Sequence, residues 1–596
     1  MILILVALLA AVPAATLRVE QELPDQPPGK PAQEDALART PGMRVPFGSY
    51  ESIQVNVDAL GQNVVGDAAN EPSIAVNPVN PSNMVLGFRQ FTTVTSNFRQ
   101  AGKAYTFDGG DHWVFNGVLD PGIFRSDPSV DVDSWGTFYY QSLRGPGVNR
   151  VEVFYSIDGG ISWSTPFAAN GGDKNWLAVD RTGGPGNGFL YGIWQRYASC
   201  CGNNVFTRSS TGGVYWHTPV PVPLFPTFGT LAVGPTGTVY ATGFEGSPPS
   251  GPDPTRFVVA RSANASDPNV PATFTSVEVD LGGAGRAFAA PNPDGLLGQP
   301  YVFTQGSNVY LLASVVPPGD PLDVHVIRSL DGGTTWAEAV RVNDDAPGSW
   351  QWMGAGAAAP SGRVDALWFD TRNGAGNMNL AQLFYAYSWD GGTTWSPNVA
   401  VTPSFDTSIG YPQQDKLGDY FTLVSGETGA DVAFAATFNG EQDIYYVRVF
   451  PDCNGNGVSD VTDLAGASLD CDADHVPDEC QAAPACLGAG GLGGLTVARS
   501  PAGDLTLHWS GSCHAGDGDY AVYEGVLGSF SSHTPRACTT AGATSQVLTP
   551  AAGDTYYLVV PTQADREGSY GQEGPGIERP AAASACFPQD VRACSP

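Results

Sequence analysis

Basic residues are scarce in this chain. Only 28 Lys and Arg stand against 59 Asp and Glu among 596 residues, which gives a formal net charge of -31. Such an excess of negative charge repels the phosphate backbone of nucleic acids and the headgroups of anionic lipids. Nucleic acid is therefore excluded as an expected partner.

Long apolar runs are also rare. Residues 2–11 form an unbroken apolar run with the length of a signal-peptide core, and small residues follow at 12–15. We expect residues 1–15 to be a signal peptide, with a buried strand as the alternative. No other stretch reaches the roughly 20 apolar residues that a membrane span needs. The sequence thus predicts no membrane insertion and a protein that is secreted to the medium or to a periplasm.

Cysteine is nearly absent from the first 450 residues, where only Cys200 and Cys201 occur. These neighbours can pair with each other, pair elsewhere or stay reduced, and we expect a structural role for both. The other eight cysteines lie between Cys453 and Cys594. An even number in so small a region is typical of a disulfide framework in an oxidising compartment, although the pairing cannot be read from the sequence.

Glycine and proline, in contrast, are abundant, with 74 and 48 residues, and aromatic residues reach 11%. Short aliphatic segments between so many turn formers favour an all-β protein of many brief strands. The length implies two to four domains. Residues 16–48 are Pro-rich and charged, so we expect a flexible leader and ordered structure from about Tyr50.

One phrase, Ser/Thr-x-Asp-x-Gly-x-x-Trp, recurs along the chain. Four good copies and a fifth, degenerate one occupy residues 106–113, 156–163, 329–336, 388–395 and 209–216. The glycines permit the positive φ of a tight hairpin turn, the Asp can accept hydrogen bonds from turn amides, and the Trp can pack beneath the hairpin. Self-similarity at intervals of tens of residues indicates a stacked or radial repeat.

The phrase is the Asp-box, or BNR repeat, and through it residues 50–450 resemble the sialidase-like β-propellers. The resemblance implies that each box joins the third and fourth strands of a blade, away from any active site. Seven segments look like successive inner strands: 71–78, 127–133, 173–180, 230–237, 287–303, 351–364 and 415–426. We expect a β-propeller over residues 49–450, with seven blades favoured and six possible, closed by a strand at 52–60.

A calcium-binding linker is expected over residues 451–487. Two acidic loops there resemble thrombospondin type 3 and dockerin repeats, and hard oxygen ligands at such spacing suit Ca²⁺. The second loop has His475 in place of the turn glycine. The expected ligands are Asp452, Asn454, Asn456, Asp460 and Asp463 in the first loop, and Asp470, Asp472, Asp474 and Asp478 in the second. Alternating residues in 488–596 favour a small β-sandwich, loosely similar to a fibronectin type III domain.

The resemblance also raises the question of catalysis. Sialidases clamp the carboxylate of sialic acid with three arginines and use a tyrosine nucleophile paired with a glutamate, and an aspartate acid/base. Arg89 lies in GFRQF, which lacks the Ile-Pro of the family's arginine motif. The candidate catalytic residues are Arg89, Arg125, Arg372, Tyr420, Asp127 and Glu71, and further candidates are Arg196, Asp173, Asp370 and Asp419. Polar residues at strand ends also cap turns or pair across blades, which is the structural alternative.

Two function classes remain open. A hydrolase would be an exo-α-sialidase-type glycoside hydrolase, whereas a binding module would stack Trp176, Trp194, Trp350 and Trp352 of the propeller mouth on a glycan or protein. The sequence favours a glycan- or protein-binding extracellular module, and leaves open whether the protein is an enzyme. The discriminating feature is whether the three arginines meet around one cavity with Tyr420 and a carboxylate.

Overall fold

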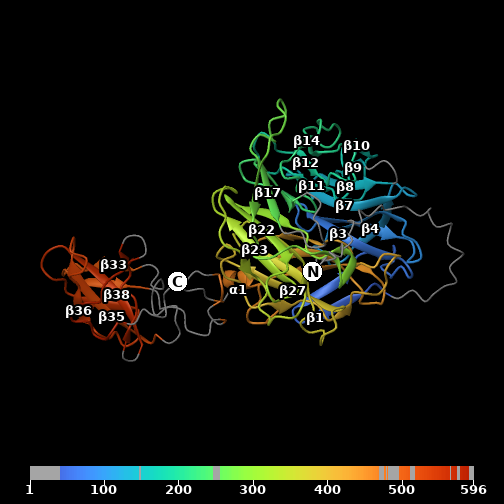
Figure 1. Ribbon diagram of the computed structural model, residues 1–596. Helices are drawn as coiled ribbons and strands as arrows, with labels where there is room; N and C mark the ends of the chain where they lie inside the picture. Colours follow the sequence, from blue (N-terminus) through green and yellow to red (C-terminus); the bar gives the residue numbers. More distant parts are fainter. Residues whose placement is uncertain are drawn as a thin grey trace, which may run out of the picture. The chain divides into compact units, whose positions relative to one another are not determined.

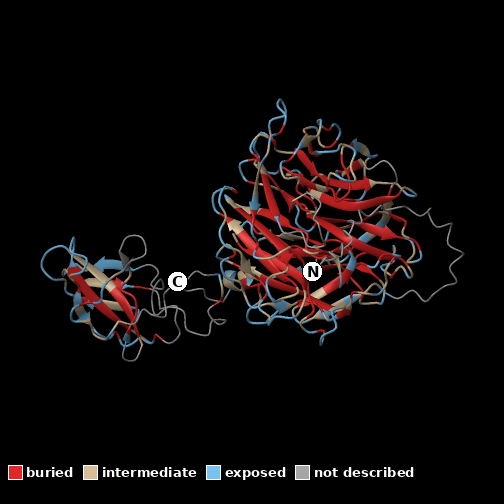
Figure 2. Cartoon of the chain, in the orientation of Figure 1, coloured by how far each residue is buried: buried red, intermediate tan, exposed pale blue. Residues whose placement is uncertain are grey.

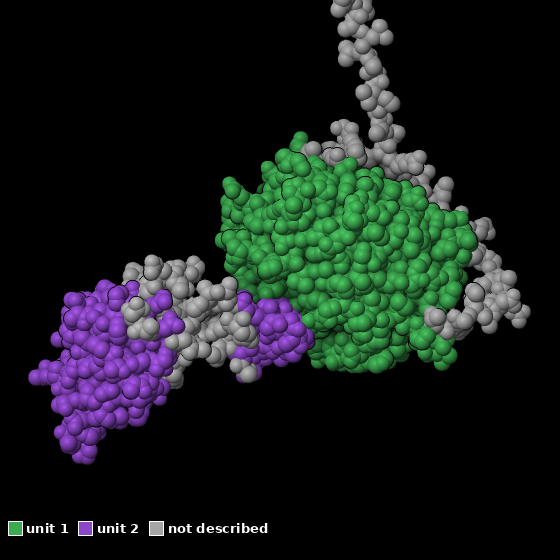
Figure 3. All heavy atoms as spheres, turned by 90° about the horizontal axis from the view of Figure 1, so that it is seen from below, with its two compact units in different colours: residues 1–450 green, residues 451–596 purple. Residues whose placement is uncertain are grey.

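The computed structural model describes residues 41–145, 150–245, 256–466, 468, 475–477, 480, 495–509, 517–563, 566–573 and 577–589. The chain divides into two compact units, residues 1–450 and 451–596, which Figure 3 colours green and purple. Within the described ranges the regular structure is β-strand apart from one α-helix, α1 (Asp460–Ala465). This confirms the all-β class. The expected signal peptide and the leader up to residue 40 lie outside the described residues.

Seven antiparallel sheets of four or five strands, here named A to G, make up most of the described part of the first unit (Figure 1). Sheet A contains β3 (Ala68–Val76), β4 (Met84–Phe91), β5 (Arg99–Thr106) and β6 (Val114–Leu119). Sheet B contains β7 (Arg125–Val132), β8 (Phe138–Arg144), β9 (Arg150–Ser156) and β10 (Phe167–Ala169). Sheet C contains β11 (Trp176–Val179), β12 (Leu190–Ile193), β13 (Asn204–Ser209) and β14 (Val220–Pro221). Sheet D contains β15 (Leu231–Val233), β16 (Val239–Phe244), β17 (Phe257–Ser262) and β18 (Thr275–Val279).

After sheet D the chain forms a small hairpin, β19 (Ala287–Ala289) and β20 (Asn292–Leu296), and then continues into sheets E to G. Sheet E contains β21 (Tyr301–Gln305), β22 (Asn308–Val315), β23 (Asp323–Ser329) and β24 (Val340–Arg341). Sheet F contains β25 (Gln351–Ala358), β26 (Val364–Asp370), β27 (Leu380–Ser388) and β28 (Val399–Ala400), with β29 (Phe405–Asp406) beside β27. Sheet G contains β30 (Thr422–Ser425), β31 (Ala430–Ala436), β32 (Asp443–Val449), β2 (Tyr50–Gln54) and β1 (Arg44–Phe47).

The sheets stand in a closed ring. The first strand of each sheet contacts the first strand of the next, and β30 of sheet G contacts β3 of sheet A. Figure 2 shows that the strands are buried along most of their length, whereas the loops at the periphery are exposed. Each sheet therefore packs its apolar faces against its two neighbours, which is the arrangement of a β-propeller.

The N-terminal segment closes the ring. β2 pairs with β32 in antiparallel register, with Ile53 opposite Tyr446, so the strand expected near residues 52–60 is present but occupies Tyr50–Gln54. β1 then pairs with β2, with Arg44 opposite Ile53. Ordered structure thus begins before the expected position near Tyr50, because β1 covers the outer edge of β2.

The first strands of sheets A and B each contain a bulge, and a serine hydroxyl group just after each bulge bonds to the next sheet. Glu71 and Asp127 lie in bulges of β3 and β7 with φ of 52° and 48°. Such a bulge redirects the side chains that follow. The Ser73 hydroxyl accepts the Val130 N–H at 2.9 Å, and the Ser129 hydroxyl accepts the Leu177 N–H at 3.0 Å. These hydroxyl groups hold sheets A, B and C together around the axis.

The repeated phrase forms the turn between the third and fourth strands of its sheet. In sheet E, Ser329 donates to Asp331 at 2.8 Å, and Asp331 accepts the Thr335 N–H at 2.8 Å. A sixth such turn, which the sequence did not reveal, lies in sheet D, where Ser262 donates to Asn264 and Asn264 accepts the Thr273 N–H. An amide replaces the carboxylate there, since its oxygen accepts the same turn hydrogen bonds.

The described part of the second unit contains two larger sheets and a short hairpin, β40 (Gln572–Glu573) and β41 (Ile577–Glu578). One sheet has the strands β33 (Thr496–Arg499), β34 (Leu505–His508) and β37 (Ser545–Leu548). The other has β36 (Thr534–Ala537), β35 (Asp519–Val526), β38 (Thr555–Gln563) and β39 (Arg566–Glu567). Leu507 and Trp509 pack with Tyr520, Val522 and Val559 in one core shared by these two sheets.

Three disulfides are present among the described cysteines. Cys200 pairs with its neighbour Cys201 in the first unit, so of the three possibilities the vicinal bond is the one found. In the second unit Cys453 pairs with Cys480 and Cys538 pairs with Cys586. The expected C-terminal disulfide framework is thus present at these four cysteines.

Candidate functional site

A cluster of buried charges lies where the first strands of sheets A, B, C and G converge. Arg89 Nη1 lies 2.9 Å from Glu71 Oε1, and Lys416 Nζ lies 3.5 Å from the same oxygen. Asp419 Oδ2 lies 2.5 Å from Lys174 Nζ and 3.1 Å from Lys416 Nζ. All five side chains are buried. The cluster thus alternates two carboxylates with three cations, and each charge has a partner of opposite sign.

The segment that precedes β30 supplies two of the five side chains of this cluster, Lys416 and Asp419. Gln414 accepts a hydrogen bond from Arg89 Nη2 at 2.5 Å, and the Leu417 N–H donates to Asn292 Oδ1 at 2.9 Å. The Leu296 N–H donates to Asp419 Oδ1 at 3.1 Å. Residues 414–419 are therefore fastened both to sheet A and to the β19–β20 hairpin.

Burial and pairing shift the two carboxyl groups in opposite directions. Loss of water raises the pKa of Glu71 to about 7, although Arg89 and Lys416 oppose the rise. Burial alone would also raise the pKa of Asp419, but Lys174 and Lys416 outweigh it and hold that pKa well below its usual range. Two carboxyl groups with separated pKa values are an arrangement that acid/base catalysis uses, and buried ion pairs in a structural core produce it too.

Four of the six candidate catalytic residues come together here. Tyr420 is buried, and its pKa is raised well above its usual value by burial and then by the nearby charges of Glu71 and Asp127. Its hydroxyl donates to the Pro128 carbonyl oxygen at 2.8 Å. Asp127 accepts the Lys174 N–H at 2.6 Å. Glu71, Arg89, Asp127 and Tyr420 are thus neighbours, and the Tyr420 hydroxyl, Asp127 and Glu71 Oε1 are engaged by the backbone or by the cations of the cluster, whereas the buried Glu71 Oε2 accepts no hydrogen bond from a described residue.

Arg125 does not join this group. Its Nη2 lies 2.7 Å from Asp120 and 2.6 Å from Glu152, and its guanidinium lies 4.8 Å from the ring centroid of Phe154. These partners belong to sheet B and to the loop before it. Arg125 therefore ties the first strand of sheet B to the third strand of the same sheet.

Arg372 lies in a third environment. It contacts Asp370 at 2.9 Å, Asp344 at 2.6 Å and Asp345 at 3.5 Å, all three from sheet F or the loop before it. Arg89, Arg125 and Arg372 thus form ion pairs with different carboxylates, and none of the three lines the axial cavity or the hollow between sheets D and E that are described below. Asp370, a further candidate acid, is the partner of Arg372.

The remaining candidates are also engaged. Asp173 accepts a hydrogen bond from the Gln195 side chain, and Arg196 stacks on Tyr197 and Phe225 at 4.7 Å. Sequence reasoning missed Lys174 and Lys416. The signal was present in the recurring Asp-Lys pair at residues 173–174 and 415–416, just before two of the inner strands.

The four tryptophans expected at the mouth divide into two pairs. Trp194 and Trp352 are 1% and 0% exposed, so the expectation that they face a ligand is wrong: they fill the space between strands. Trp350 is half-buried beside Arg286, whose guanidinium lies 5.0 Å from its ring. Trp176 is also half-buried, and its ring contacts those of Tyr301 and Tyr420 at 5.9 and 5.3 Å.

Trp176 borders a cavity of about 460 Å³ on the ring axis. The first strands of all seven sheets line it, and hydroxyl groups recur on its wall. These hydroxyl groups belong to Ser73, Ser129, Thr182, Thr230, Thr304, Thr422 and Ser425. Four of them, those of Ser73, Ser129, Thr230 and Thr422, each accept a backbone N–H of a neighbouring sheet. Arg181 and Asp131 pair with each other on the same wall. Tyr420 contacts the Trp176 ring, but neither Tyr420 nor the charged residues of the cluster line the cavity.

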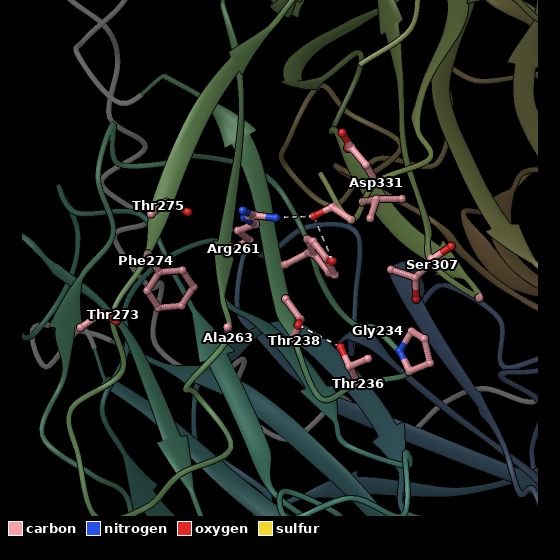
Figure 4. Close-up of a pocket in the computed structure, with 16 residues that line it drawn as sticks. Gly234, Thr236, Thr238, Arg261, Ala263, Thr273, Phe274, Thr275, Ser307 and Asp331 are labelled. Carbon is pink, nitrogen blue, oxygen red and sulfur yellow. Dashed lines mark hydrogen bonds between the residues drawn. The ribbon is translucent and has the colours of Figure 1, made fainter. Parts of the chain in front are cut away.

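A larger hollow of about 630 Å³ lies between sheets D and E (Figure 4). Arg261 extends across it and donates to the Gly332 carbonyl at 2.9 Å and to the Thr334 hydroxyl at 3.0 Å. Arg208 and Arg328 reach the following sheet in the same way, by donating to backbone carbonyls of its turn. Arg261 therefore follows a structural pattern of the ring, and the hollow carries no separate argument for a ligand.

The first acidic loop of the second unit brings its oxygen-bearing side chains together. Asp452 accepts the N–H groups of Asn456 and Gly457 at 3.0 and 3.1 Å. Asp463 Oδ2 accepts the side-chain amides of Asn454 and Asn456 at 3.2 and 2.9 Å. Gly457 has a φ of 80°, which the turn requires. Positions one, three, five and twelve of the loop thus converge, and the residue types fit a Ca²⁺ ion.

Asp460 is the exception in this loop. It is buried, and its Oδ1 accepts the Cys453 N–H at 2.9 Å. It also lies near Cys453 and Cys480, but these cysteines form a disulfide and have no thiolate to offer a metal. The expected ligands Asp470, Asp472, Asp474 and Asp478 of the second loop lie outside the described residues.

No protein-family model and no curated protein matches this chain. Among solved structures, a protein of unknown function from Dyadobacter fermentans is 14% identical with a TM-score of 0.38, over 68% of this chain and 100% of that one. A leech intramolecular trans-sialidase complexed with 2,7-anhydro-Neu5Ac is 13% identical with a TM-score of 0.36, over 53% and 67%. A fungal alcohol oxidase in complex with copper is 11% identical with a TM-score of 0.41, over 88% and 96%. Likenesses this remote assign no activity, so function is argued from the site.

Proposed function

We propose that the chain is a secreted recognition protein: a seven-bladed, sialidase-like Asp-box propeller that binds a glycan, or an extracellular protein, in its axial cavity. The cavity carries this proposal. At about 460 Å³ it falls in the size range of ligand sites. Its wall combines the Arg181–Asp131 pair, whose exposed guanidinium can donate to sugar hydroxyls, with the indole of Trp176, which can stack on the apolar face of a sugar ring.

The buried cluster argues against hydrolysis as the primary role. A catalytic tyrosine and glutamate must reach a substrate atom within hydrogen-bond distance. Tyr420 and Glu71 are 5% and 0% exposed, and the arginines that would clamp an acidic sugar pair with different carboxylates. One observation favours the alternative, an exo-α-sialidase-type hydrolase: Tyr420, Glu71 and Asp127 are neighbours, as a tyrosine nucleophile and its partners would be.

Binding and hydrolysis can be separated in one series. We expect the mature protein to release no fluorophore from a fluorogenic sialoside, and to bind at least one oligosaccharide of a panel that contains 3′-sialyllactose, lactose and cellotetraose. Replacing Trp176 with Leu should weaken that binding about tenfold, the loss of one ring contact. Titration calorimetry measures the affinity.

The exposed Trp135, which lies outside the cavity lining, provides the control as Trp135→Ala. Equal affinities of wild type and Trp176→Leu would place the ligand elsewhere. Release of sialic acid that Tyr420→Phe abolishes would instead establish the hydrolase.

Further parts of the proposal concern the second unit. We infer that the loop at residues 452–463 binds Ca²⁺, that Asp470, Asp472, Asp474 and Asp478 bind a second Ca²⁺, and that the two sheets beyond them form a fibronectin type III-like sandwich. The convergence of Asp452, Asn454, Asn456 and Asp463 supports the first loop. The disulfides support export through an oxidising compartment.

Replacing Asp452 and Asp463 together with Asn should remove one bound Ca²⁺ per chain, because the loop then loses both of its carboxylates from the converging set. Equilibrium dialysis against Ca²⁺ measures the stoichiometry. Asp554→Asn, at an exposed position of the same unit, is the matched control and should leave it unchanged. An unaltered stoichiometry in the double variant would contradict a calcium site in this loop.

A further inference from the structure

A buried carboxyl group lies where the ring closes. Asp67 directly precedes β3 of sheet A and is 2% exposed. Asn56, from the segment after β2, donates to its Oδ2 at 3.4 Å, and Gln90 of β4 donates to the same oxygen at 2.6 Å. The same Asn56 amide also donates to Asp443, the first residue of β32. Groups from sheets A and G, the first and the last of the ring, thus meet around Asp67.

The contact between Asp67 and Gln90 is half complete. Gln90 Nε2 donates to Asp67 Oδ2 and also to the Phe91 carbonyl at 3.2 Å, which fixes the orientation of the amide. The remaining oxygens of the two side chains, Asp67 Oδ1 and Gln90 Oε1, are buried, and neither accepts a hydrogen bond from a described residue. Two acceptors cannot bond to each other while Asp67 is ionised. A buried acceptor without a partner is costly, so the ionised form of Asp67 fits this position poorly.

One proton on Asp67 satisfies both oxygens. A protonated carboxyl group offers an O–H that donates and a C=O that accepts. With the proton on Oδ1, Asp67 can donate to Gln90 Oε1 while Oδ2 continues to accept from Gln90 Nε2. The two side chains then form a cyclic acid–amide pair with two parallel hydrogen bonds.

The charges around Asp67 also favour a proton. The titratable groups that act on it are Asp443 and Glu441, both acidic and both from the beginning of β32. Arg89, the sequence neighbour of Gln90, forms its ion pair with Glu71 on the axis instead. Burial raises the pKa of Asp67 well above its usual range, and the charge of Asp443 adds to the rise. No cation among the described residues offsets these effects at Asp67.

Asp443 differs from Asp67 in its hydrogen bonds. Its Oδ1 accepts the Asn56 amide, and its Oδ2 accepts the amides of Gln54 at 2.9 Å and Asn439 at 2.6 Å. Burial raises the pKa of Asp443 to about 7, although these donors oppose the rise. Because donors occupy both of its oxygens, Asp443 ionises before Asp67. Its negative charge then opposes the ionisation of Asp67.

We propose that Asp67 is protonated at neutral pH and that the Asp67–Gln90 pair makes the closure of the ring pH-sensitive. Loss of the proton places a further buried negative charge between sheets A and G and leaves Gln90 Oε1 without a donor. Near the usual pKa of an aspartate the folded and unfolded chains both bind this proton. Between that pH and the raised pKa only the folded chain binds it, so stability falls as pH rises through this window.

Urea unfolding of the full mature chain at several pH values between about 5 and 7 tests the proposal. The unfolding equilibrium constant of the first unit should rise about tenfold more per pH unit in wild type than in Asp67→Asn, because the variant lacks one proton that the folded chain binds. The Asn side chain can form the same two bonds with Gln90, so the variant should unfold at no lower urea concentration than wild type at pH 8. Asp111→Asn, at an exposed position of the same unit, is the matched control and should keep the wild-type pH dependence.

Infrared spectroscopy at pH 6 detects the proton directly. The carbonyl band of protonated carboxylic acids should lose the intensity of one group in Asp67→Asn. In Gln90→Met, which is similar in length, part of the band should move to higher frequency because the Asp67 O–H has lost its acceptor. Should Asp67→Asn not fold, the frequency shift in Gln90→Met decides alone. An unchanged band in these variants, or equal pH dependence of wild type and Asp67→Asn, would overturn the proposal.

Discussion

Replacing Asp419 with Ala is expected to lower the free energy of unfolding of the first unit by about 3–5 kcal/mol. Asp419 is 1% exposed and is the closest carboxylate to both Lys174 and Lys416. Its removal leaves two buried ammonium groups short of negative charge, because the remaining carboxylates, Glu71 at 3.5 Å from Lys416 and Asp173 at 3.9 Å from Lys174, are farther away. The Leu296 N–H also loses its acceptor.

Urea unfolding followed by tryptophan fluorescence measures this loss. Asp415→Ala is the matched control, since Asp415 lies in the same segment but is exposed, and it should change stability by less than about 0.5 kcal/mol. A loss of the same small size for both variants would mean that the cluster contributes nothing to holding the segment in place. Low pH should also weaken the cluster, because Asp419 stabilises the fold only while it is ionised, above its depressed pKa.

Replacing Trp352 with Ala is expected to cost about 3–5 kcal/mol, the usual range for removing a large aromatic side chain from a core. Trp352 is fully buried on the first strand of sheet F, and its ring lies 4.9 Å from that of Phe369. The surrounding strands belong to a closed ring and cannot collapse into the space. Differential scanning calorimetry of the first unit's transition measures the effect.

The exposed Trp135 again provides the comparison, because Trp135→Ala leaves no cavity and should be nearly neutral. This pair also tests where ligand contacts lie. Retained stability together with lost glycan binding in Trp352→Ala would show that Trp352 does face a ligand, against its burial in the structure.

The repeated turn made the ring of sheets predictable. Its serine, aspartate and glycines act within one hairpin, so local sequence contains all that the turn needs, as Ser329 and Asp331 show. The closing strand was also foreseen, because its alternation is local. β1 was missed, since Arg44–Phe47 lies among proline and charged residues and becomes a strand only by pairing with β2.

The site was less predictable because its chemistry depends on partners far apart in sequence. Arg89, Arg125 and Arg372 look alike in the sequence, yet each pairs with carboxylates of a different region. Lys416 lies 345 positions from Glu71, its partner in the cluster. No local pattern states which of many acidic residues will meet a given arginine, and likewise none distinguishes the core residue Trp352 from the cavity residue Trp176.

The pairing of β2 with β32 sets the timing of folding during biosynthesis. The Tyr50 hydroxyl donates to the Phe450 carbonyl across 400 residues. A ribosome that adds about 5–20 residues per second needs roughly 20–80 s to cover that distance. During this interval the edge of β2 that later pairs with β32 stays unpaired. Pairing between strands so far apart in the chain is itself slow. A chain that stalls before β32 therefore presents open strand edges to its neighbours, so the synthesis of β32, rather than of any earlier strand, allows the ring to close in its native form.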